Sequence, residues 1–216
     1  MSATGRGAER RKADQYMTPY DAIESLLFSE NCPDFIRQSR TILEPCAGDC
    51  GSLRKISECL PNAKVRGIEL DPLIIPKDVT ECVQGNFMDM KLPVPGSIDL
   101  CMTNPPFGYI DDAGNDVSWM DFFVRMEKFS ERGVVLLLRL NVFGSLSRKD
   151  FWNTNPASHV LVLASRPKFW EPGRVKRVGS IDKKTGKFKP GTDACEYAWF
   201  CWDKNATYDG TIIKVI

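Results

Sequence analysis

Residues 104–107 hold the side chains that point most directly to chemistry in this chain. Asn104, Pro105, Pro106 and Phe107 follow an alternating, mostly apolar run that is typical of a buried strand. Consecutive prolines fix the backbone and donate no amide hydrogen bonds, so they form a stiff ledge. The ledge holds the Asn104 amide toward a cleft, and Phe107 offers a flat face for a planar ring. Open α/β sheets bind ligands at this carboxyl end of their strands.

A second candidate motif lies about fifty residues upstream and has the same layout. Residues 41–46 read as a strand that contains Glu44, and Gly48 and Gly51 follow in the turn before a helix. A further acid, Glu69, closes the next expected strand. Because consecutive parallel strands end at one edge of a sheet, these groups are expected to lie close to residues 104–107.

The motifs, in this order, resemble those of S-adenosylmethionine-dependent methyltransferases that modify exocyclic amino nitrogens, and among them the DNA adenine-N6 methyltransferases. Residues 104–107 match the catalytic motif (Asn/Asp/Ser)-Pro-Pro-(Tyr/Phe/Trp), and the resemblance runs from about Asp14 to Asp203. It implies an α/β, Rossmann-like class I fold. The expected sheet has seven strands, is mostly parallel with one antiparallel strand, and carries helices on both faces. Residues 165–169 and 196–200 look like those of small phage and prophage adenine methyltransferases.

The same resemblance implies S-adenosyl-L-methionine as the cofactor. The turn after residues 41–46 would cradle its methionine part, although the family has a glycine where Cys50 stands, unless Cys50 is an insertion. Glu69 would accept the ribose hydroxyls, and Asn86 would bind the adenine amino group, with Asp89 as a competing acceptor. The run 14–19 would close over the methionine end. The expected cofactor contacts are Tyr16, Thr18, Pro19, Glu44, Cys46, Ala47, Gly48, Glu69, Leu70, Asn86 and Phe87.

The implied mechanism is one of positioning. The Asn104 side-chain oxygen and the Pro105 carbonyl would each accept an N6 hydrogen of adenine, which localises the nitrogen lone pair for attack on the sulfonium methyl. The catalytic set is therefore residues 104–107, with the base flipped out of its duplex and stacked on Phe107. The chain has one histidine, His159, which begins an apolar run and is expected to be a strand-edge imidazole. Reactions that need several histidines are excluded.

Three alternatives share these motifs. RNA adenine methylation uses the same chemistry, and a basic segment suits either nucleic acid. Methylation of a glutamine amide on a protein is the second alternative. The third is a catalytically idle nucleic-acid-binding protein of this fold, which intact Asn104 and Phe107 disfavour.

Positive charge is concentrated in residues 165–190. The whole chain has a formal net charge of +1, yet this segment has nine basic and two acidic residues, so the rest of the chain is net negative. Such an uneven distribution is typical of a phosphate-binding face and predicts DNA as the partner, with RNA as the alternative. Its prolines and glycines favour a long hairpin loop over a domain. The expected nucleic-acid contacts are Arg166, Lys168, Arg174, Lys176 and Arg177.

Strands and helices are expected to alternate within one domain, residues 14–216, after a mobile basic tail at 1–13. Thr18 and Pro19 suggest an N-cap and a first helical residue. The expected helices are residues 19–27, 52–60 and 118–129. The expected strands are residues 41–46, 65–70, 82–86, 98–103, 134–138, 160–164 and 197–202.

Several classes of protein are disfavoured. No apolar run is long enough to span a membrane, and the N-terminus has no apolar segment typical of a signal peptide or anchor. Eight cysteines without a paired rhythm suggest free thiols in a reducing, cytoplasmic compartment. Cys46 and Cys50 are spaced like metal ligands but have no second pair nearby, so no metal is expected.

Overall fold

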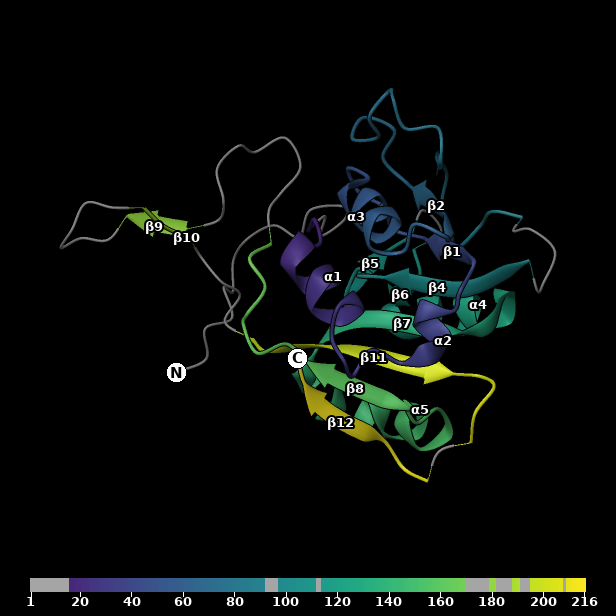
Figure 1. Cartoon of the computed structure of the whole chain (residues 1–216), viewed down its shortest axis with the longest axis vertical. Coiled ribbons are helices and arrows are strands. Elements are labelled where there is room, and N and C mark those ends of the chain that lie inside the picture. Colours follow the sequence, from purple (N-terminus) through teal and green to yellow (C-terminus); the bar gives the residue numbers. More distant parts are fainter. Residues whose placement is uncertain are drawn as a thin grey trace.

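An eight-stranded sheet forms the centre of the molecule (Figure 1). The computed structural model describes residues 16–91, 97–111, 114–169, 179–181, 188–190, 195–207 and 209–216. Neighbouring strands follow the order β12-β8-β11-β7-β4-β1-β2-β3. Their bounds are β1 Thr41–Glu44, β2 Lys64–Glu69, β3 Cys82–Gln84, β4 Ile98–Thr103, β7 Ser130–Arg139, β8 His159–Val162, β11 Tyr197–Asp203 and β12 Ile212–Val215.

The sheet is parallel except for β11, which pairs antiparallel with β7 on one side and β8 on the other. The expected mostly parallel sheet with one antiparallel strand is therefore confirmed. The expected count of seven strands is wrong by one, because β12 adds an edge strand parallel to β8. Residues 212–215 are all exposed, so this strand lacks the alternating burial that would have predicted it.

Apolar side chains alternate between the two faces of the sheet and bury a separate core on each. One core packs under α1 (Tyr20–Leu27), α2 (Asp34–Arg37) and α3 (Gly51–Cys59), and the other under α4 (Trp119–Phe129) and α5 (Lys149–Thr154). Along β4, for example, Leu100 and Met102 belong to the first core and Cys101 to the second. Helices thus cover both faces, as the sequence predicts.

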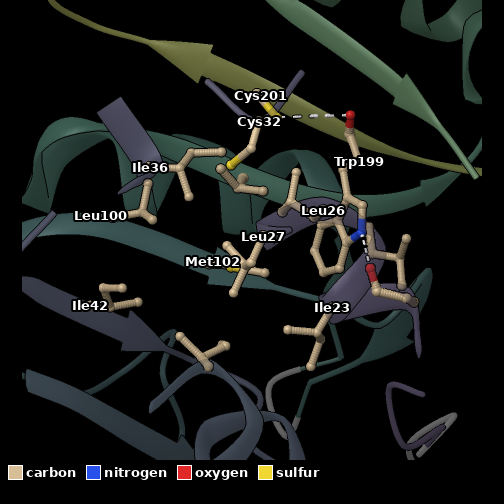
Figure 2. Close-up of a cluster of buried hydrophobic side chains, with 14 of the residues drawn as sticks. Ile23, Leu26, Leu27, Cys32, Ile36, Ile42, Leu100, Met102, Trp199 and Cys201 are labelled. Carbon is tan, nitrogen blue, oxygen red and sulfur yellow. Dashed lines mark hydrogen bonds between the residues drawn. The ribbon is translucent and has the colours of Figure 1, made fainter. Parts of the chain in front are cut away.

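The first core attaches α1 to the middle of the sheet (Figure 2). Ile23 and Leu26 of α1 are fully buried close to Trp199 of β11. The Trp199 indole N–H donates to the Ala22 carbonyl oxygen at 2.8 Å, which satisfies a polar group inside an otherwise apolar cluster. This anchorage sets the position of residues 16–19, which lead into the helix.

Several short elements lie outside the sequence expectations. They are the hairpin of β5 (Gly108–Ile110) and β6 (Asp116–Ser118), the helices α2 and α5, and two 3-10 turns, Leu140–Phe143 and Leu146–Arg148. Each is too short to show a clear apolar period. At the start of α1 the N-cap is Pro19, without a side-chain cap, so the expected capping by Thr18 is wrong.

Within the basic segment, β9 (Gly179–Ile181) and β10 (Phe188–Pro190) pair antiparallel. The assignment of residues 165–190 to one loop, and of 14–216 to one domain, stays a prediction, and the tail at 1–13 lies outside the described residues. Among the described residues, no helix combines the length and apolarity that crossing a bilayer requires.

Candidate active site

A pocket opens where β1, β2, β3 and β4 reach their carboxyl ends. It is open to solvent, and together with its solvent-filled mouth it contains about 680 Å³ of empty space. Its lining combines apolar and aromatic surface with a carboxylate and two amides. The lining residues are Tyr16, Met17, Pro45, Cys46, Gly48, Glu69, Leu70, Gly85, Asn86, Phe87, Asn104, Pro106, Tyr109 and Phe122.

The turn after β1 requires glycine at position 48. Its φ of 56° lies in the left-handed region, and a Cβ there would lie 2.6 Å from the Met17 sulfur. The Gly48 N–H donates to Glu69 Oε2 at 2.7 Å, and the Asp71 N–H donates to Oε1 at 2.9 Å. Glu69 therefore ties the glycine turn to the end of β2.

Cys50, where the sequence departs from the family pattern, has the only left-handed backbone among the described non-glycine residues, with φ of 62°. It is the N-cap of α3 and its side chain is fully buried. The structure thus places a cysteine in a conformation that glycine adopts more easily. Cys50 does not line the pocket.

The N-terminal run contributes two residues to the pocket. Tyr16 and Met17 line it, and Thr18 and Pro19 do not. Met17 is buried over the glycine turn, where the Asp49 N–H donates to its sulfur at 3.2 Å. Through Met17, the N-terminal run therefore packs against the glycine turn.

Glu44 and Ala47 are buried and do not line the pocket. Glu44 Oε1 accepts the Cys46 N–H at 3.1 Å. Burial raises the pKa of Glu44 to about 8, and burial also raises the pKa of Glu69. Glu44 is one of the cofactor contacts expected from the sequence, and in the structure its buried side chain supports the turn from inside the protein.

Asn86 and Phe87, which follow β3, also line the pocket. The Asn86 side-chain oxygen accepts the Met88 N–H at 3.0 Å, and its amide nitrogen donates to Asp89 at 2.6 Å. The Asn86 amide thus stabilises its own turn. Phe87 is buried and stacks on Phe122, with ring centroids 5.7 Å apart and planes inclined by 20°.

Residues 104–107 directly follow β4. Asn104 and Pro106 line the pocket, whereas Pro105 is buried and Phe107 is half-buried outside the lining. The Asn104 amide nitrogen donates to the Tyr16 carbonyl oxygen at 3.3 Å. The side-chain oxygen of the same planar amide is consequently the atom that can accept a hydrogen from a ligand.

The sequence analysis did not assign five lining residues, Met17, Pro45, Gly85, Tyr109 and Phe122. Tyr109 lies two residues after Phe107, and burial raises the pKa of its phenol to about 12. Phe122 belongs to the apolar stripe of α4 and was interpreted as core. It packs in the core and also contributes to the pocket wall.

Two of the expected nucleic-acid contacts can be located. Arg166 is exposed and forms an ion pair with Glu196, and Lys168 is exposed. Arg174, Lys176 and Arg177 lie outside the described residues.

All eight cysteines are free thiols, as expected. In the described part of the chain, no three histidine, cysteine, aspartate or glutamate side chains gather as a metal site would require.

The fold is that of Rossmann-like methyltransferases. A type I restriction-modification system methyltransferase subunit from Streptococcus thermophilus superimposes with a TM-score of 0.59 and 13% identity, over 95% of this chain and 48% of that one. Precorrin-6y C5,15-methyltransferase from Geobacter metallireducens superimposes with a TM-score of 0.51 and 13% identity, over 89% and 93% of the respective chains.

The present chain thus spans about half the length of the first of these proteins. No family model matches the sequence, and no curated protein matches it. At 13% identity these comparisons establish the fold alone.

Proposed function

We propose that this protein transfers a methyl group from S-adenosylmethionine to the exocyclic N6 of adenine in DNA, after the base has been flipped out of its duplex. One observation carries the proposal. The Asn104 amide faces the same pocket as Gly48 and Glu69, so an amino-group acceptor lies beside a turn suited to the cofactor.

The pocket residues fit the cofactor. Gly48 has no side chain, and the Met17 thioether packs against the turn at this point. The Glu69 carboxylate accepts the Gly48 and Asp71 N–H groups, and its two oxygens have further acceptor capacity for a hydroxyl. The apolar surface of Phe87 and Leu70 suits a planar base. When bound, the cofactor supplies an electrophilic methyl group.

The residues around Asn104 act by holding the target nitrogen. The Asn104 side-chain oxygen and the Pro105 carbonyl would accept hydrogen bonds from the two N6–H groups, and these bonds would localise the lone pair on the nitrogen. The hydrogen bond to the Tyr16 carbonyl fixes the orientation of the Asn104 amide. Positioning of this kind accounts for roughly 7–11 kcal/mol of barrier reduction in well-oriented systems.

DNA is the first substrate to test, because one structural neighbour belongs to a restriction-modification system and because of the basic segment. The experiment incubates the protein with isotope-labelled cofactor and separate pools of DNA, RNA and protein, followed by digestion to nucleosides and amino acids. Label in N6-methyldeoxyadenosine supports the proposal. Label only in RNA adenine or only in glutamine would move the substrate to that class, and a folded protein that labels none of the pools would contradict methyl transfer.

A further inference from the structure

Arg139, at the carboxyl end of β7, lies directly against the aromatic residue of the catalytic motif. Its guanidinium carbon is 4.4 Å from the Phe107 ring centroid, a cation–π contact. Its Nε–H donates to the Tyr197 hydroxyl at 2.9 Å, and the Tyr197 ring meets Phe107 edge-on. Arg139 is half-buried, and the sequence analysis did not single it out.

Further ring contacts connect Arg139 to the mouth of the pocket. Phe169 packs on Tyr197 with centroids 4.9 Å apart, and Tyr16 packs on Phe169 at 6.2 Å. The Tyr16 carbonyl accepts the hydrogen bond from Asn104. A closed series of contacts therefore joins the catalytic motif, Arg139, the first residues of the basic segment and the N-terminal run.

Residues around 104–107 carry charges of both signs. The β5–β6 hairpin, which contributes Tyr109 to the pocket, carries the carboxylates of Asp111 and Asp116. The Arg139 guanidinium lies over Phe107, and the exposed Lys168 stands one residue before Phe169. The hairpin carboxylates repel a polyanion, and these two cations attract it.

We propose that Arg139 positions the target nucleotide by binding the phosphate beside it. The proposal rests on the proposed function. The guanidinium covers the Phe107 ring, and Phe107 also packs against the core on the α1 side, so a base that stacks on this ring competes with the guanidinium. Stacking of the base displaces the guanidinium. Its planar fork then binds the nucleotide's phosphate, a group that arginine binds through two parallel hydrogen bonds.

The test measures the salt dependence of binding to single-stranded oligodeoxyadenylate, in which every base is adenine. The variants are Arg139→Met, which keeps most of the aliphatic stem, and Arg139→Lys, which keeps the charge. Arg132→Met is the matched control, because Arg132 lies near the amino end of the same strand, away from the pocket. Each phosphate contact on a single strand contributes about −0.7 to the slope of log affinity against log salt.

Arg139→Met should reduce the magnitude of that slope by about 0.7 and weaken binding at low salt. Arg139→Lys should keep the slope, and Arg132→Met should behave as wild type. The cofactor-induced rise in melting temperature should be the same in all four proteins. An unchanged slope in Arg139→Met would show that Arg139 only packs against Phe107 and Tyr197, and would overturn the proposal.

Failure of this inference and failure of the proposed function are distinguishable. A wild-type protein that is stabilised by the cofactor but does not bind oligodeoxyadenylate overturns the role of Arg139 and leaves the cofactor site in place. A folded protein that the cofactor does not stabilise overturns the proposed function itself.

Discussion

Replacing Glu44 by glutamine should remove most of the pH dependence of stability between weakly acidic and weakly basic conditions. Glu44 is buried beneath the glycine turn, and burial raises its pKa from 4.5 to about 8. The folded protein therefore holds this proton more tightly than the unfolded chain does. Protonated Glu44 makes its full contribution to the free energy of unfolding below about pH 4.5. That contribution is lost as the pH rises to about 8.

The size of the effect follows from the shift. One pKa unit corresponds to about 1.36 kcal/mol, so the wild type should lose at most roughly 5 kcal/mol of unfolding free energy across this window. A loss of that order is large against the roughly 5–15 kcal/mol by which domains are stable. Glutamine keeps an oxygen for the Cys46 N–H, but its amide has two N–H donors where the protonated carboxyl has one O–H, so one donor is added. An unpaired buried donor costs about 1–3 kcal/mol, so the variant should be the less stable protein near pH 5 and the more stable one near pH 8.

The assay is urea unfolding of both proteins at several pH values between about 5 and 8. The pKa of Glu69 is also raised, so the informative quantity is the difference between wild type and variant at each pH. That difference should change sign within the window. Parallel curves would refute the argument, because Glu44 would then have a similar pKa in the folded and unfolded chains. The variant should retain the cofactor-induced rise in melting temperature, since Glu44 does not line the pocket.

Three further substitutions test the pocket. Glu69→Ala should lower the unfolding free energy by about 1–3 kcal/mol, because the buried Gly48 N–H loses its acceptor, and should also reduce the cofactor-induced melting shift; a full shift would remove Glu69 from the cofactor site. Gly48→Ala should destabilise by about 1–3 kcal/mol, through its positive φ and the close approach to Met17, measurable by urea unfolding; an unchanged stability would mean that the turn relaxes freely. Phe107→Leu should weaken oligodeoxyadenylate binding by roughly 1–3 kcal/mol without altering the cofactor shift, and equal affinity in a binding titration would exclude stacking on this ring.

Much of the fold follows from local patterns in the sequence. The expected strand at residues 98–103 matches β4, and the alternation of apolar residues predicts a sheet with two cores. The edge strand β12 was missed, because its exposed residues show no burial pattern. The β5–β6 hairpin is held by its own turn, in which Asp111 accepts the Asn115 N–H at 2.7 Å, and three-residue strands leave no period to detect.

The site was predictable where side chains follow strands directly. Glu69, Asn86 and Asn104 line one pocket, because the carboxyl ends of parallel strands meet. The burial of Glu44 was not predictable, since its sequence neighbours do not show that α3 and the turn cover it. Arg139 escaped detection because its contact with Phe107 joins residues 32 positions apart in the sequence, in a geometry that only the folded sheet creates.

Methyl transfer to adenine N6 in DNA can be detected directly by mass spectrometry of nucleosides from DNA incubated with the protein and isotope-labelled S-adenosylmethionine. The wild type should convert deoxyadenosine to labelled N6-methyldeoxyadenosine. Asn104→Ala should bind the cofactor with an unchanged melting shift and form no such product, since the lost oxygen acts on the amino group of the target base. Full activity in Asn104→Ala, or unlabelled DNA from a folded, cofactor-binding wild type, would contradict the account.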